Sequence, residues 1–122
     1  MKKSIEDLQN SCDTCPIPDE MKSDLCHICA AQHLIRGKWK LLIIWLLRHH
    51  EMRFSQLMSA IPNVKQSPLT AQLKDLAESG LVFRKSYDEV PPKVEYSLTD
   101  KGKSFIEVLQ QMDLWAKGNL FS

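Results

Sequence analysis

The sequence has 122 residues and a mass of 14.0 kDa, with 43% hydrophobic and 25% charged residues, which is typical of one globular domain and leaves no room for a second. The longest apolar run, residues 41–47, is far shorter than the roughly 20 residues that a membrane-spanning helix needs. The N-terminal residues have no apolar segment of the kind that directs secretion. We therefore expect a cytoplasmic protein with reduced cysteines and no membrane partner.

The net charge of +1 is distributed unevenly. Residues 1–35 contain three Lys or Arg against six Asp or Glu, a charge of −3, whereas residues 36–103 contain twelve against seven, a charge of +5. The last nineteen residues contribute −1. A basic middle region between acidic ends allows a polyanion such as DNA as partner.

The first 25 residues are predicted to form an arm, because acidic residues and serines are mixed there with Pro16 and Pro18. Only residues 5–8 have the pattern of a short helical turn. Residues 38–48 are almost all apolar, and a run of this length favours a central helix buried on most sides over a strand.

Two capped helices are predicted next, with a turn between them. Ser55 is expected to cap a short helix that ends at Pro62. Ser67 is expected to cap the second helix, with Pro68 at its first position and Gly80 just beyond its end. The buried stripe of the second helix has the spacing i, i+4, i+7 and consists of Leu69, Leu73 and Leu76.

Residues 81–87 and 93–98 change to strand chemistry and predict a β-hairpin, with Val94, Tyr96 and Leu98 pointing inward. The loop between them contains two acidic residues and two prolines, so it is a stiff exposed tip. Thr99 is then expected to cap a last long helix.

This order of elements predicts an α+β, mostly α fold, a winged helix-turn-helix with terminal dimerisation helices. We divide the chain into a cysteine-containing arm (1–25), a winged helix-turn-helix domain (26–99) and a C-terminal dimerisation helix (100–122). The last helix has an apolar stripe that a small monomer could not fully cover, and it predicts a homodimer. The stripe consists of Phe105, Leu109, Met112 and Trp115.

The second capped helix is the candidate DNA-reading element, because a helix of this length can enter the major groove and direct its N-terminal turn at base edges. Its polar, small and basic side chains can meet adenine, guanine, a thymine methyl or phosphate. The wing offers basic residues for the DNA backbone. The candidate DNA-binding residues are Lys65, Gln66, Ser67, Thr70, Ala71, Gln72, Lys74, Arg84, Lys85 and Lys93.

Five segments closely resemble the HxlR family of bacterial and archaeal transcriptional regulators. They are residues 34–43 (LIRGKWKLLI), 53–57 (RFSQL), 69–76 (LTAQLKDL), 80–82 (GLV) and 90–99 (VPPKVEYSLT). The likeness extends over about residues 26–116. It implies a winged helix-turn-helix homodimer, assembled through terminal helices, that binds a two-fold symmetric operator in double-stranded DNA and represses or activates transcription.

The four cysteines form two Cys-x-x-Cys pairs, Cys12 with Cys15 and Cys26 with Cys29. Two such pairs match a tetrahedral thiolate site for zinc or another thiophilic metal, although the gap of ten residues between them is short. His27 and His33 are lesser candidate ligands.

The family resemblance implies a different use of the same residues. Cys26 falls where such regulators often carry a cysteine before the first helix, which in some members senses oxidants, quinones or aldehydes. A thiolate near a helix N-terminus would be activated by the helix dipole. In this chain His27 replaces the proline that follows the cysteine in many members. A metal site, a thiol switch and no special role all remain open for these cysteines.

Two other functions compete with transcriptional regulation. A thiol-disulfide oxidoreductase could use a Cys-x-x-Cys pair, but that chemistry usually places the motif after a strand in a βαβ unit, not in a proline-containing arm. A winged helix can also serve protein interaction without binding DNA. No nucleophile triad or phosphate-binding glycine loop is present, so we expect no enzymatic activity.

Overall fold

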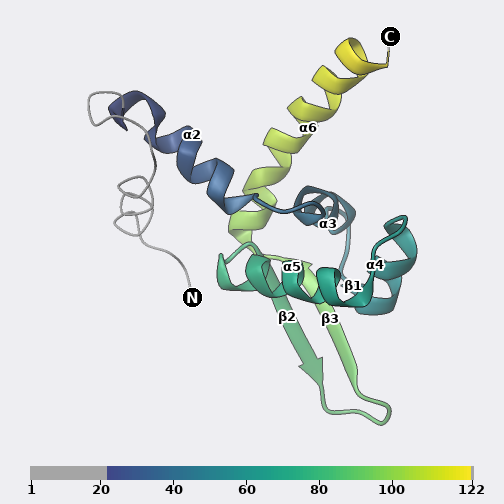
Figure 1. Ribbon diagram of the computed structural model, residues 1–122. Helices are drawn as coiled ribbons and strands as arrows, with labels where there is room; N and C mark the ends of the chain where they lie inside the picture. The colour runs from purple at the N-terminus through teal and green to yellow at the C-terminus, as the bar shows by residue number, and fades with distance from the viewer. Residues whose placement is uncertain (1–21, 122) are drawn as a thin grey trace.

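The computed structural model describes residues 22–121 as a winged helix-turn-helix fold with two projecting helices (Figure 1). Antiparallel pairing places β3 between β1 and β2. The elements in chain order are α2 (Lys22–Leu34), α3 (Lys40–Leu46), β1 (Met52–Arg53), α4 (Phe54–Ala60), α5 (Gln66–Glu78), β2 (Val82–Tyr87), β3 (Lys93–Leu98) and α6 (Asp100–Leu120). The predicted fold class is confirmed. The predicted helical turn at residues 5–8 lies outside the described residues, as do Cys12 and Cys15.

The core lies where α3, α4 and α5 meet the base of the sheet and the first half of α6. Apolar burial is the main favourable term in folding, so these side chains fix the arrangement of the helices. The largest fully buried side chains are Ile43, Ile44, Leu57, Ile61, Leu69, Leu73, Leu76 and Leu81. The helix-turn-helix pair α4 and α5 therefore packs against a buried apolar core.

Three parts of the molecule project from this core (Figure 1). The β2–β3 hairpin forms the wing and extends on one side, and the second half of α6 extends on the opposite side. Helix α2 runs outward at an angle to α6. With 21 residues, α6 is about 31 Å long, so only part of it can lie on so small a body.

Helix α5 begins two residues earlier than predicted. Lys65, with extended backbone angles, is its N-cap residue, and Ser67 and Pro68 lie within the first turn. The prediction that Ser67 caps this helix is wrong, because the backbone turns helical at Gln66 and Leu69 N–H donates to Lys65 O at 3.2 Å. Pro68 is still tolerated, since the first four N–H groups of a helix have no partner within it.

The end of α5 is as predicted. Gly80 takes a positive φ of 80°, and its N–H and that of Leu81 bond back to the carbonyls of Ala77 and Leu76 at 3.1 and 3.0 Å. These two bonds are the Schellman motif that closes many helices. They fix the direction in which the chain leaves the helix and enters the wing.

Thr99 caps α6 as predicted, since its hydroxyl oxygen accepts a hydrogen bond from Gly102 N–H at 3.0 Å. The same hydroxyl donates to Gly80 O at 2.6 Å, and Thr99 N–H donates to Leu81 O at 3.1 Å. A Cβ added at Gly102 would collide with the Leu81 carbonyl oxygen. Thr99 and Gly102 thus fasten α6 to the segment that joins α5 to the wing.

The start of α4 differs from the prediction. Arg53, not Ser55, precedes its first residue, and Gln56 Oε1 accepts the Arg53 N–H at 2.8 Å. The amide of Gln56 thus supplies the cap that was assigned to a serine. Arg53 also belongs to β1, a two-residue strand that sequence patterning is too coarse to predict.

Helix α2 is a finding of the structure, because no helix was assigned to residues 26–37. It crosses the expected boundary between the arm and the domain at residue 25, and that domain division stays a prediction. None of the helices between residues 22 and 121 combines the length and the apolar character required to cross a bilayer.

Candidate nucleic-acid interface

One side of α5 is buried and the other faces solvent. Leu69, Leu73 and Leu76 are at most 1% exposed, as the predicted stripe requires. The opposite face is polar, small and basic. Its exposed residues from the leading end onward are Lys65, Gln66, Ser67, Thr70, Ala71 and Lys74, and the exposed acidic residues Asp75 and Glu78 follow at the far end.

The positive charges on this face are available to a ligand. Within the described part of the chain, neither Lys65 nor Lys74 has an ion-pair partner. The Thr70 hydroxyl donates to Gln66 O at 2.8 Å, so it is oriented along the helix and keeps its lone pairs for an incoming donor. The leading end of α5 can therefore offer both point charges and oriented polar groups to DNA.

Gln72 is placed differently from the other predicted contacts. Its side chain is half-buried, and Oε1 accepts a hydrogen bond from Trp39 N–H at 3.0 Å. That contact competes with the predicted adenine contact, because the amide oxygen is already used. The role of Gln72 in base reading stays a prediction, as do the roles of the other α5 residues.

The strand register sorts the wing residues onto two faces. Lys85 is opposite Glu95 and Tyr87 opposite Lys93, so these four side chains share the outer face. Arg84 is opposite Tyr96 on the other face, and its guanidinium donates to Ser86 Oγ at 3.1 Å. The predicted inward residues Tyr96 and Leu98 are buried, and Val94 is half-buried.

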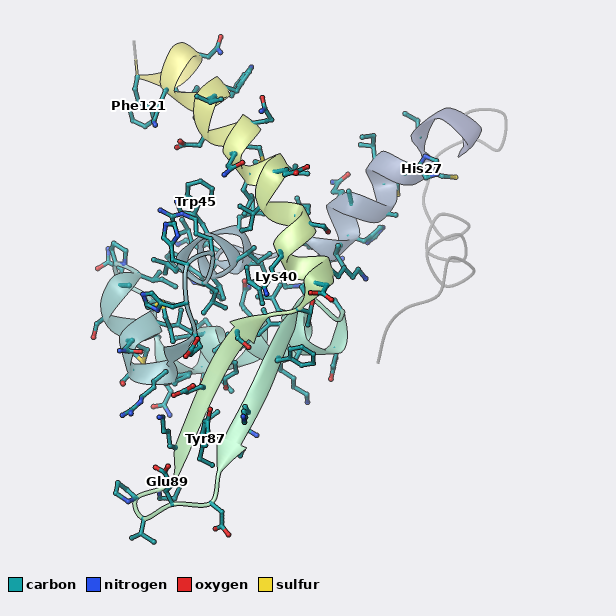
Figure 2. The ribbon with its side chains drawn as sticks, turned by 180° about the vertical axis from the view of Figure 1, so that it is seen from behind. His27, Lys40, Trp45, Tyr87, Glu89 and Phe121 are labelled. Carbon is teal, nitrogen blue, oxygen red and sulfur yellow. The ribbon has the colours of Figure 1, made fainter. Side chains whose placement is uncertain are left out.

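Lys93 is not a free charge. Its Nζ lies 2.8 Å from Glu95 Oε1, and this hydrogen bond raises the pKa of Lys93 and lowers the pKa of Glu95 relative to their ordinary values. The ammonium groups of Lys85 and Lys93 also lie 5.0 and 4.9 Å from the Tyr87 ring centroid. Figure 2 shows Tyr87 on the hairpin, with Glu89 at its tip.

Arg53 is an exposed basic residue of this region that is not among the predicted DNA-binding residues. The β1–β3 pairing puts it opposite Glu95, on the face that carries Lys93. Its positive charge opposes the rise in the pKa of Lys93 that the hydrogen bond to Glu95 causes. The available signal was its position directly before the first helix of the helix-turn-helix pair. Only the pairing of β1 with the wing, however, brings it beside the other cations.

The candidate dimer residues fall into two groups. Leu109 is buried and Phe105 is half-buried, and both pack on the core of their own chain. Leu109 is therefore buried within its own chain, and its role in a dimer stays a prediction. Met112 and Trp115 are 44% and 61% exposed, and they lie on the projecting half of α6.

Cys26 and Cys29 lie three residues apart in α2, hence on one side of it. Cys29 is buried and Cys26 half-buried. Because α2 is described from Lys22 onward, Cys26 is at least one turn inside the helix, so the expectation that it precedes a helix is wrong. The dipole acts mainly on the first turn. His27, labelled in Figure 2, is exposed on the same helix. His33 is exposed there as well.

Within residues 22–121 no three His, Cys, Asp or Glu side chains are placed to hold a metal ion. The predicted zinc site also needs Cys12 and Cys15, which lie outside the described residues. Zinc binding by the four cysteines therefore stays a prediction.

A helix with a polar outer face, fixed on a buried stripe and flanked by a basic hairpin, defines a winged helix-turn-helix DNA-binding protein. Residues 34–122 match the family described as HxlR-like helix-turn-helix. The chain belongs to this family, and it is a transcriptional regulator.

Relatives and solved structures agree with this assignment. The chain is 45% identical over 101 residues to an uncharacterised HTH-type transcriptional regulator of Methanothermobacter thermautotrophicus, covering 81% of this chain and 77% of the relative. The redox regulator HypR in its oxidised form superposes with a TM-score of 0.73 at 36% identity, covering 77% of this chain and 97% of HypR. The reduced form of the regulator YodB from B. subtilis superposes with a TM-score of 0.66 at 33% identity, covering 84% of this chain and 94% of YodB.

Proposed function

We propose that this regulator acts as a homodimer that reads a two-fold symmetric operator with α5 and holds the DNA backbone with the wing. The observation that carries the proposal is the exposed polar and basic face of α5 from Lys65 to Lys74, opposite its buried leucine stripe. Such a face fits the major groove, where lysine, glutamine and threonine side chains can bond to base edges. DNA as the ligand also places the regulator in the cytoplasm.

The dimer proposal rests on the projecting half of α6. Val108, Met112 and Trp115 follow one another at helical spacing of four and three residues, and all are exposed. Exposed aromatic and apolar side chains in one stripe favour burial against another chain. A second copy is the natural occupant, because one module of this size makes too few contacts for tight specific binding, and two related half-sites double them.

We further propose thiol control through α2. HypR is a redox regulator, and YodB has also been crystallised after diamide treatment. Cys26, half-buried on a projecting helix, is the candidate sensor. In the proposed reaction two cysteine thiols lose two protons and two electrons to an oxidant such as diamide and form one disulfide. Zinc held by the four cysteines is the alternative control.

Selection of binding sites from random DNA tests these proposals together. The selection is run with reduced protein, with diamide-treated protein and with chelator-treated protein. We expect a palindromic site from the reduced protein and two chains per site by size measurement. Failure to enrich any sequence contradicts operator binding. Equal DNA binding by the reduced and the diamide-treated protein contradicts thiol control. Loss of DNA binding after chelator treatment favours control by zinc.

A further inference from the structure

The connecting segment 35–39 joins α2 to α3 and is fastened to α5 by one side chain. Gln72 reaches from α5 to this segment, and its Oε1 accepts Trp39 N–H at 3.0 Å. Gly37 has a φ of 135°, and a Cβ built there would lie 2.6 Å from Gln72 Nε2. The backbone of the connecting segment therefore passes directly over the amide of Gln72.

A second contact, one turn further along α5, joins this helix to the start of α3, directly after the connecting segment. Lys40, the first residue of α3, places its Nζ 3.5 Å from Asp75 Oδ2, with only 8% of its side chain exposed. Gln72 and Asp75 are three residues apart, so they lie on the same side of α5. Together they form a clamp, which we define as Gln72 with Trp39 and Asp75 with Lys40.

The clamp lies where α2 joins the body. Among the described residues, α2 reaches the core with Leu34 at its C-terminal end, and the rest of the helix runs away from the body (Figure 1). A movement of α2 therefore reaches the body through Leu34 and residues 35–39. The element that this segment touches with side-chain bonds is the DNA-reading helix.

We infer that Gln72 and Asp75 are positioning residues, which set the orientation of α5 against the connecting segment and pass a displacement of α2 to the DNA-reading face. The inference that Gln72 and Asp75 pass on a displacement of α2 rests on the proposed thiol control. The inference that they set the orientation of α5 does not rest on it. It assigns Gln72 a role other than base reading, because an amide turned toward DNA would leave Trp39 N–H without its acceptor.

The experiment uses the full-length protein and four variants. Gln72→Met removes the acceptor at similar volume, and Gln72→Glu keeps an oxygen acceptor but loses the NH₂ donor that adenine readout needs. Asp75→Asn removes the partner of Lys40. Glu78→Gln is the matched control, since it removes one negative charge from the same end of α5 but has no ion pair among the described residues.

The first readout is amide hydrogen exchange at Trp39, together with affinity for the selected operator and for its single-base variants. For Gln72→Met we expect faster exchange and a loss of about threefold to tenfold in affinity on every sequence alike, the effect of one lost hydrogen bond. Gln72→Glu should keep both the protection and the sequence preference. Loss of preference at one base pair in both variants, with Trp39 exchange unchanged, would overturn the positioning role.

The second readout is the ratio of DNA affinity between reduced and diamide-treated protein. Asp75→Asn and Gln72→Met should bring this ratio toward one, whereas Glu78→Gln should keep the wild-type ratio. An unchanged ratio in both clamp variants contradicts the transmission of α2 movement. If the wild-type ratio is already one, thiol control fails, and Trp39 exchange with the operator series still decides the positioning role. Circular dichroism confirms that each variant is folded.

Discussion

The two candidate DNA-binding regions, α5 and the wing, are both basic in sequence but differ in how they are held. Helix α5 stands on three leucines that are at most 1% exposed, and a Schellman motif fixes its end. The outer half of the wing consists of two strands whose tip is exposed on all sides, with Val90 fully exposed. A groove-reading element needs a fixed orientation, whereas a hairpin on the DNA backbone tolerates movement.

The two regions also differ in how much of their charge is available. Lys65 and Lys74 on α5 have no ion-pair partner in the described chain, while Lys93 on the wing is bound to Glu95. A count of basic residues therefore overstates the positive charge of the wing. We expect α5 to discriminate between sequences and the wing to add a modest, sequence-independent attraction through Arg84 and Lys85.

The largest expected difference between α5 and the wing is in how much their apolar packing contributes to the free energy of unfolding. Leu73→Ala should lower the free energy of unfolding by about 2–5 kcal/mol, because it opens a cavity under α5. Val94→Ala, in the half-buried part of the wing, should cost about 1 kcal/mol or less. Urea unfolding followed by tryptophan fluorescence measures both. Equal losses would show that the wing depends on packing as much as α5 does.

The next difference concerns specificity. Lys74→Ala and Thr70→Ala should each weaken operator binding by about tenfold to a hundredfold for the cognate site, as loss of a base contact does, with the fold intact. Arg84→Ala should lower affinity on all sequences alike and reduce the slope of log affinity against log salt by about one. Fluorescence anisotropy with the operator and with scrambled DNA measures these effects.

Two outcomes would contradict this second prediction. Unchanged operator binding in all three variants would contradict the assignment of α5 and the wing to DNA. A sequence-dependent loss in Arg84→Ala would instead place Arg84 at base edges, because a backbone contact carries no sequence information.

Local sequence signals predict most of the fold, because each was carried by residues close together in the chain. The leucine stripe of α5, Gly80 after it, the two strands of the hairpin and the Thr99 cap follow from spacing and residue type alone. The caps of α4 and α5 were assigned to serines, but Arg53 and Lys65 hold those positions. Ser55 and Ser67 have the right chemistry but lie two residues after the observed N-cap positions.

Contacts between distant residues account for what the sequence could not predict. Gln72 resembles a base-reading residue in sequence, and only its bond to Trp39, 33 residues away, reveals another partner. Lys93 resembles a free wing cation until the strand register puts it beside Glu95 on the outer face. Leu109 belongs to the core because α6 packs against α3, a contact that the helical period of the sequence cannot reveal.

The smallest expected effect is the release of Lys93. Glu95→Gln should free its ammonium group, tighten binding to scrambled DNA slightly and steepen its salt dependence by at most about one phosphate contact. The Tyr87 hydroxyl, 3.3 Å from Glu95 Oε2, can still donate to the glutamine oxygen, so the wing keeps this bond. Glu89→Gln, at the exposed tip, removes one negative charge without breaking the ion pair, and because Glu89 acts on Lys93 only through its charge, its gain should be smaller.

The pH dependence of this pair gives a second check. The pKa of Glu95 is lowered below its ordinary value of 4.5 and that of Lys93 raised above 10.5, so both groups stay charged between about pH 6 and 8. A depressed carboxyl pKa contributes stability above 4.5 that is lost only as the pH falls through the folded value. The difference between Glu95→Gln and wild type should therefore be constant from about pH 6 to 8. An equal gain in Glu89→Gln would mean that total charge, and not the ion pair, limits the wing.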